Sequence, residues 1–97
     1  ADCLYAPHLG EEAQIAEVVA AVAPKPVNVL TVSRPVAALA ALGARRISVG
    51  GGLARVAWGE FLRAAREIAG DGTFTSFAKA ASGTELNGLF AGRDDDR

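Results

Sequence analysis

The most informative stretch of the chain lies at residues 44–58, where the sequence is ARRISVGGGLARVAW. The short segment Ile47-Ser48-Val49 leads through three glycines into an apolar segment that begins at Leu53. Consecutive glycines permit a tight turn between a strand and a helix. The stretch therefore predicts one βα unit, a short strand followed by a helix from Leu53 to about Ala69.

Two earlier segments repeat this order of strand and helix. The first has a short apolar run from Leu4 to Ala6 that Pro7 stops, and then a helix that opens at residues 10–12. One face of that helix carries apolar residues at the i, i+3, i+4, i+7 spacing, namely Ile15, Val18, Val19 and Val22. Together with the second segment, which is described next, this segment predicts a regular alternation of strands and helices.

The second segment is the run at residues 27–32, which is largely apolar and thus typical of a strand covered on both faces. We expect Ser33 to cap the next helix, Pro35 to occupy its first turn and Gly43 to close it. Residues 70–72, Gly-Asp-Gly, are expected to break the third helix. Two short helical stretches follow, around 74–81 and 85–90, with Thr73 and Thr84 as expected caps and a hinge at residues 82–83.

This order, β-α-β-α-β-α and then extra helices, predicts an α/β fold with right-handed crossovers and a parallel sheet. Three parallel strands cannot close an eight-stranded barrel, and they leave two open edges. We therefore expect the 97 residues to depend on neighbouring chain for part of their stability.

Composition excludes several functional classes. The net charge is −1 with scattered arginines, which argues against nucleic-acid binding. The single cysteine, Cys3, rules out an internal disulfide and gives no metal-ligand spacing. No apolar run approaches the roughly 20 residues that span a bilayer, and no signal-peptide pattern opens the chain. These features predict a cytoplasmic protein without a membrane partner.

Candidate binding residues lie where the predicted strands end, because ligands of βα folds bind at the C-terminal ends of the strands. His8 is the only histidine and is either a substrate contact or a loop residue. Thr31 follows the second strand, and Arg34 either pairs with a carboxylate or faces solvent. Gly50 and Gly51 lead a helix N-terminus that either holds an anion or simply permits a tight turn.

Other chemistry-bearing residues favour structural roles. Asn28 lies within a strand, where a buried amide usually satisfies backbone neighbours. Cys3 has no base near it in the sequence. Residues 93–97, RDDDR, are expected to be a disordered tail rather than a metal site. No paired acids, P-loop or catalytic triad pattern is present, so no catalytic or metal-binding residue is predicted.

Several segments together resemble the C-terminal third of the isocitrate lyase/phosphoenolpyruvate mutase family, most closely its phosphonomutase-like branch. They are ADCLYAP at 1–7, KPVNVL at 25–30, ALGARRISVG at 41–50, LAR at 53–55 and TELN at 84–87. The resemblance implies that residues 1–70 are strands six to eight of a (β/α)₈ barrel. Residues 71–92 would then be a C-terminal helical extension, in this family often exchanged between subunits of a homo-oligomer.

The same resemblance implies a Mg²⁺-dependent enzyme that makes or breaks C–C or C–P bonds in small α-keto or α-hydroxy carboxylates. The family's metal-binding acids and catalytic loop belong to earlier strands, so these 97 residues alone are expected to be inactive. Two alternatives stay open, a non-catalytic module that oligomerises through its sheet edges and a phosphate-binding part of a phosphosugar barrel.

Two departures bear on the substrate. Methylisocitrate-lyase-like members carry Asn and Thr at the end of the seventh strand, where this chain has Leu30-Thr31-Val32. Lyases also carry a Glu after the sixth strand, at about the place of His8. These differences argue against lyase action on methylisocitrate or isocitrate.

Overall fold

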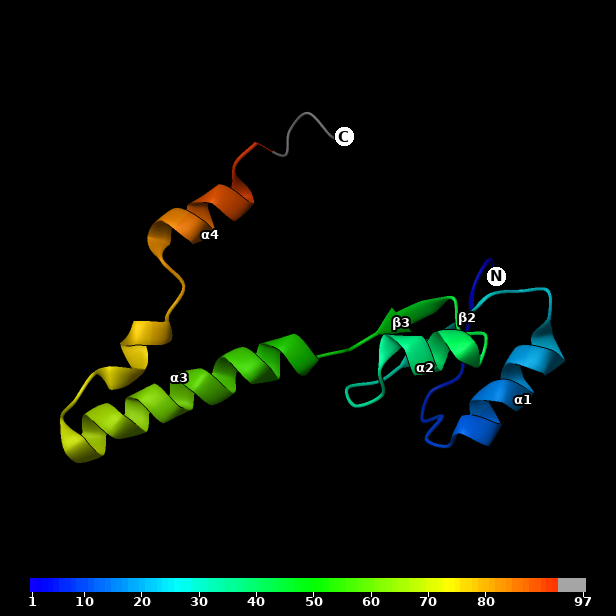
Figure 1. Ribbon diagram of the computed structural model, residues 1–97, viewed down its shortest axis with the longest axis horizontal. Helices are drawn as coiled ribbons and strands as arrows, with labels where there is room; N and C mark the ends of the chain where they lie inside the picture. The colour runs from blue at the N-terminus through cyan, green and yellow to red at the C-terminus, as the bar shows by residue number, and fades with distance from the viewer. Residues whose placement is uncertain (93–97) are drawn as a thin grey trace. The chain divides into compact units, whose positions relative to one another are not determined.

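The computed structural model describes residues 1–92. Helices and strands alternate along the chain and are followed by two short helices (Figure 1). The elements are β1 (Leu4–Tyr5), α1 (Glu12–Val22), β2 (Val27–Leu30), α2 (Val36–Ala41), β3 (Arg46–Ser48), α3 (Gly52–Asp71), the 3₁₀ helix η1 (Thr75–Lys79) and α4 (Gly83–Phe90). The chain forms two compact units, which meet in sequence between Val56 and Ala57, inside α3.

The first unit is built on a three-stranded parallel sheet in the order β1-β2-β3. Leu4 pairs with Val27, and Val29 pairs with Ile47. The sheet confirms the predicted parallel α/β arrangement. Strand order follows chain order, so each crossover, through α1 and then α2, joins neighbouring strands.

One face of this sheet carries the core. Val27 and Val29 are 1% exposed, and they pack with Ile15 of α1 and Leu39 of α2, both fully buried. Side chains alternate between the two faces of a strand, so Val27 and Val29 share a face and Asn28 lies on the other. Both crossover helices therefore cover the same face of the sheet.

Gly43 closes α2 as expected, and it lies against Val19 of α1. Its φ is +95°, and a Cβ at this position would lie 2.7 Å from Cγ1 of Val19. The Gly43 amide donates to the carbonyl of Ala40, and the Ala44 amide to that of Leu39. Only a residue without a side chain satisfies both the left-handed backbone and the contact with α1.

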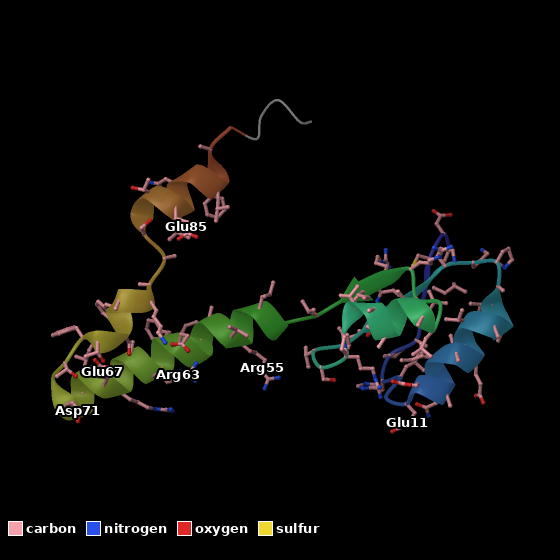
Figure 2. The ribbon with its side chains drawn as sticks, in the orientation of Figure 1. Glu11, Arg55, Arg63, Glu67, Asp71 and Glu85 are labelled. Atoms are coloured by element: carbon pink, nitrogen blue, oxygen red, sulfur yellow. The ribbon has the colours of Figure 1, made fainter. Side chains whose placement is uncertain are left out.

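The second unit comprises the rest of α3, η1 and α4. The carboxylate of Glu67 stabilises the turn from α3 to η1. Figure 2 shows Glu67 beside this turn. Oε2 accepts from the hydroxyls of Ser76 at 2.8 Å and Thr75 at 2.9 Å, and Oε1 accepts from the Thr73 hydroxyl and the Thr75 amide. These bonds, with that from Ser76 foremost, hold the pKa of Glu67 below its ordinary value.

Apolar side chains of the second unit are largely exposed. None of the side chains of α3 is buried. Two aromatic pairs meet edge to face, Trp58 with Phe61 and Phe74 with Phe77, with ring centroids 5.3 and 5.7 Å apart. Within residues 1–92, no helix is both long and apolar enough to cross a membrane.

Several element boundaries differ from those expected. α2 begins at Val36, after Pro35, and Ser33 does not cap it. α3 continues through Gly70 and Asp71 and ends before Gly72, whose φ is +67°. The cap of α4 is Ser82, whose Oγ accepts from the Glu85 amide at 3.0 Å, instead of Thr84. The unit boundary at Val56 also lies within a helix, so the predicted division at residues 70 and 71 stays a prediction.

Replacing Gly43 with Ala is expected to lower the free energy of unfolding by at least about 1–2 kcal/mol. The left-handed backbone alone accounts for that amount in a residue with a Cβ, and the contact with Val19 adds to it. Urea denaturation followed by circular dichroism measures the change. Gly10→Ala is the matched control, because a Cβ there meets nothing within 4 Å. Equal stabilities of the two variants would contradict the explanation.

The turn from α3 to η1 is expected to loosen in acid. A carboxylate whose pKa is lowered in the folded state stabilises that state above its unfolded pKa, and this stabilisation is lost as the pH falls through the folded pKa. The protection factor of the Thr75 amide, measured by NMR hydrogen exchange, should fall over that acidic range. Glu67→Gln should leave this amide weakly protected at every pH, whereas Glu17→Gln on α1 should leave the Thr75 profile unchanged.

Candidate functional site

The C-terminal ends of β1, β2 and β3 meet at one edge of the sheet, because the three strands are parallel and adjacent. This edge brings together the segments after Tyr5, Leu30 and Ser48. A Cβ on Gly50 would lie 3.4 Å from Cδ1 of Leu30, and one on Gly52 would lie 3.2 Å from Cγ1 of Val32. The second and third strand ends are thus in contact.

His8 lies in the turn between β1 and α1. It is exposed, and its φ of +62° is uncommon for a residue other than glycine. Its imidazole forms no hydrogen bond with any residue from 1 to 92. The ring therefore remains available at the edge where ligands of parallel sheets bind, and its role as a substrate contact stays a prediction.

The loop after β2 is organised by Thr31. Its Oγ1 accepts from the amides of Ser33 and Arg34, both at 3.2 Å. A hydroxyl that takes up these two amides shapes the turn itself, which explains why the helix begins only at Val36. The Thr31 amide also donates to the carbonyl of Ser48 at 2.9 Å, so the loop stays attached to β3.

Arg34 links this loop to the preceding one. Its Nη1 donates to Oε1 of Glu12 at 2.9 Å, and its Nη2 donates to the carbonyl of Gly10 at 2.6 Å. The guanidinium is partly buried. Its two hydrogen bonds hold the β1–α1 and β2–α2 loops together. In this arrangement Arg34 pairs with a carboxylate of its own chain.

Gly50 and Gly51 form the turn from β3 to α3. Gly50 has a φ of +53°, which explains glycine at this position. The Gly52 amide donates to the Val49 carbonyl and the Arg55 amide to that of Gly51, which closes the first turn. The first backbone amides of a helix have no partner within the helix. The geometry permits an anion here and equally serves as a tight connection.

A polar network crosses the sheet face opposite the helices. Arg46 donates from Nε to Oδ1 of Asn28 at 3.0 Å, and Asn28 donates from Nδ2 to Oγ of Ser48 at 2.9 Å. Asn28 is only 4% exposed. The network extends from the beginning of β3 to its end, so it reaches the edge at which the candidate residues gather.

The sequence analysis missed this network. Asn28 bonds to two side chains instead of to backbone neighbours, and neither Arg46 nor Ser48 stood out as a site residue. A signal was present in the polar-apolar-polar alternation of residues 46–48, which places Arg46 and Ser48 on one face. Their contact with Asn28 depends on the register of two strands about twenty residues apart, which composition does not supply.

Residues 1–92 contain no group of three or more His, Cys, Asp or Glu side chains that could hold a metal ion. The residues present at the strand ends, chiefly hydroxyls, an imidazole and glycines, do not fit the oxygen-rich coordination that Mg²⁺ requires. This segment alone therefore gives no metal site from which to derive a reaction step. The predicted tail at 93–97 lies outside the described residues.

One cavity lies away from this edge. It encloses about 520 Å³ at the N-terminal ends of β2 and β3, and Lys25, Pro26 and Arg45 are among the residues that line it. Ligands of parallel sheets bind at the opposite, C-terminal ends. We therefore place the candidate site at the C-terminal edge, on topology, and regard the cavity as a hollow between loops.

Comparison with known proteins gives a match to a family profile and a match to a solved structure. The profile of the phosphoenolpyruvate phosphomutase family matches residues 1–69. The chain is also similar, with 47% identity and a TM-score of 0.85, to a solved structure from Burkholderia cenocepacia J2315 that is provisionally described as a lyase/mutase. That match covers 98% of this chain and 35% of the other, so this chain spans about a third of that protein's length. No curated protein matches significantly.

Thr31→Val is expected to disorder the loop after β2 and to lower the free energy of unfolding by about 1 kcal/mol, since the amides of residues 33 and 34 lose their acceptor. Thr31→Ser keeps the acceptor and should behave like the unmodified chain. NMR amide exchange at both positions, together with urea denaturation, checks this. Unchanged exchange in Thr31→Val would show that the hydroxyl does not organise the loop.

Proposed function

Because the chain belongs to the phosphoenolpyruvate phosphomutase family, we propose that it forms the C-terminal part of a lyase/mutase barrel enzyme that acts on small α-keto or α-hydroxy carboxylates. The single observation that carries this proposal is the convergence of three parallel strand ends at one edge, with polar side chains at that edge. The 47% identity to a provisionally described lyase/mutase supports the reaction class.

The winding of the sheet supports a barrel. In an open, doubly wound sheet the strand order reverses, and helices cover both faces. Here the order is sequential, and α1 and α2 both cover the face that carries Val27 and Val29. Repeating such a unit curls a sheet toward closure with all helices outside. We assign the three strands to positions six to eight, as the resemblance implies.

In this proposal the segment contributes part of the substrate rim. His8, Thr31 and the Gly50–Gly51 turn surround the place where a carboxylate would lie, and Arg34 fixes the loops that present them. The donors in this set suit a small anion. Mg²⁺ would be held by acidic residues other than those of residues 1–92, and a cytoplasmic location completes the proposal.

A second candidate is self-association, and one observation favours it. The second unit exposes large apolar side chains, among them Trp58, Phe61 and Phe90, of which Phe90 is 84% exposed. Exposed apolar surface of this kind is typical of protein–protein contacts. An enzyme can also be a homo-oligomer. Self-association therefore replaces the proposed catalytic function only if the full product of the gene shows no turnover.

The full product of the gene and residues 1–97 alone should be assayed side by side with Mg²⁺ present. Phosphorus NMR follows C–P chemistry on phosphonopyruvate, and coupled release of pyruvate follows C–C cleavage of oxaloacetate. We expect turnover by the full product and none by the 97 residues, because these hold no metal site of their own.

Either of two results would overturn the proposal. Turnover by the 97 residues alone would show that their own side chains suffice for the reaction. Absence of both turnover and oxalate binding in the full product would exclude the carboxylate-enzyme class. Calorimetric binding of a sugar phosphate, lost on Gly50→Ala, would favour the phosphosugar alternative instead.

A further inference from the structure

The Arg46–Asn28–Ser48 network has a fixed direction. Arginine has only donors, so the Asn28 atom that faces Nε must be the acceptor Oδ1. The amide is planar, and its other atom, the donor Nδ2, therefore faces Ser48. Ser48 Oγ must accept this bond, because Nδ2 offers no lone pair. The orientation of the Asn28 amide thus follows from the chemistry of Arg46.

The hydroxyl hydrogen of Ser48 is left to donate elsewhere. No acceptor for it exists among residues 1–92, and Ser48 is partly exposed on the helix-free face. Ser48 is also the last residue of β3, so its hydroxyl lies at the C-terminal edge of the sheet. The backbone of β3 is held there separately, because the Ser48 carbonyl accepts from the Thr31 amide.

From this juxtaposition we infer that Asn28 is a positioning residue, which holds the Ser48 hydroxyl as a hydrogen-bond donor to an anionic oxygen of the substrate. Arg46 strengthens that donor, since a cation at the start of a hydrogen-bonded series polarises the bonds that follow. The ligand class is a carboxylate or a similar oxyanion. The inference rests on the proposed function, because it deepens the same site.

The burial of Asn28 agrees with this role. A side chain 4% exposed in the central strand β2 cannot easily rotate, and both ends of its amide are bonded. Leu30, the next residue on the same face, is 40% exposed and lies at the register position of Ser48. The face is thus closed around Asn28 and open at the level of Ser48.

The decisive variant is Asn28→Asp in the full product of the gene. Aspartate has nearly the same shape and accepts from Arg46 as before, but it offers no donor to Ser48. The Ser48 hydroxyl then turns to donate to Asp and is lost to the ligand. Binding of oxalate, a stable planar dianion like the enolate of pyruvate, is measured by calorimetry with Mg²⁺ present.

We expect Asn28→Asp and Ser48→Ala each to weaken oxalate binding on the order of tenfold to a hundredfold, the effect of one hydrogen bond to a charged group. The melting temperature of Asn28→Asp should not fall, because the new carboxylate pairs with Arg46. Ser48→Thr keeps the hydroxyl and should bind nearly normally. A purely structural network would instead alter stability and leave binding unchanged.

A double-mutant cycle separates the hydroxyl from the added negative charge. If Asp acts by turning the hydroxyl, Asn28→Asp should change binding little once Ser48 is Ala. If the two substitutions instead weaken oxalate binding by independent factors that multiply, the negative charge of Asp repels the ligand directly. That result would overturn the inference. Normal oxalate binding by Asn28→Asp would also overturn it, while leaving the proposed function intact. A wild-type protein that shows neither turnover nor oxalate binding would overturn both.

Discussion

The structure of the first unit depends on the two faces of a single four-residue strand. β2 directs Val27 and Val29 into the contact with Ile15 and Leu39, and it directs Asn28 to the opposite face. Full burial of four aliphatic side chains contributes about 1.5–3 kcal/mol each, which fixes the register of the neighbouring strands. A slip of one residue would place Asn28 against the helices and the valines on the polar face. The polar network and the apolar core are thus set by the same alternation.

The second unit is organised by polar contacts at its turn more than by a core. Glu67 accepts hydrogen bonds from three residues of the following segment, whereas no side chain of α3, η1 or α4 is buried. Local hydrogen bonds can define such a turn, but they supply little of the free energy that apolar burial supplies. The exposed aromatic side chains of this unit are consequently the part of the chain with the most to gain from a neighbour.

Local patterns predicted most of the fold. The spacing of Ile15, Val18, Val19 and Val22 predicted α1, and the glycines at 43 and 50 marked two turns that require a left-handed backbone. The starts of α2 and α4 were predicted less well, because the sequence offers more than one hydroxyl near each of them. Thr31 took up the amides of residues 33 and 34, and Ser82 capped the helix that Thr84 was expected to cap. For the site, the strand ends followed from topology, but the Asn28 network depends on strand register, which no local pattern contains.

The clasp that Arg34 forms with Glu12 and Gly10 has a consequence for how relatives of this chain can diversify. Insertions in either of the first two strand-to-helix loops would pull the guanidinium from its acceptors, so the lengths of these loops must change together or not at all. The turn at Gly50–Gly52 is not tied to them by any side-chain hydrogen bond within residues 1–92. New specificities would therefore arise most readily by remodelling that third turn, with the first two conserved in length as a rigid pair.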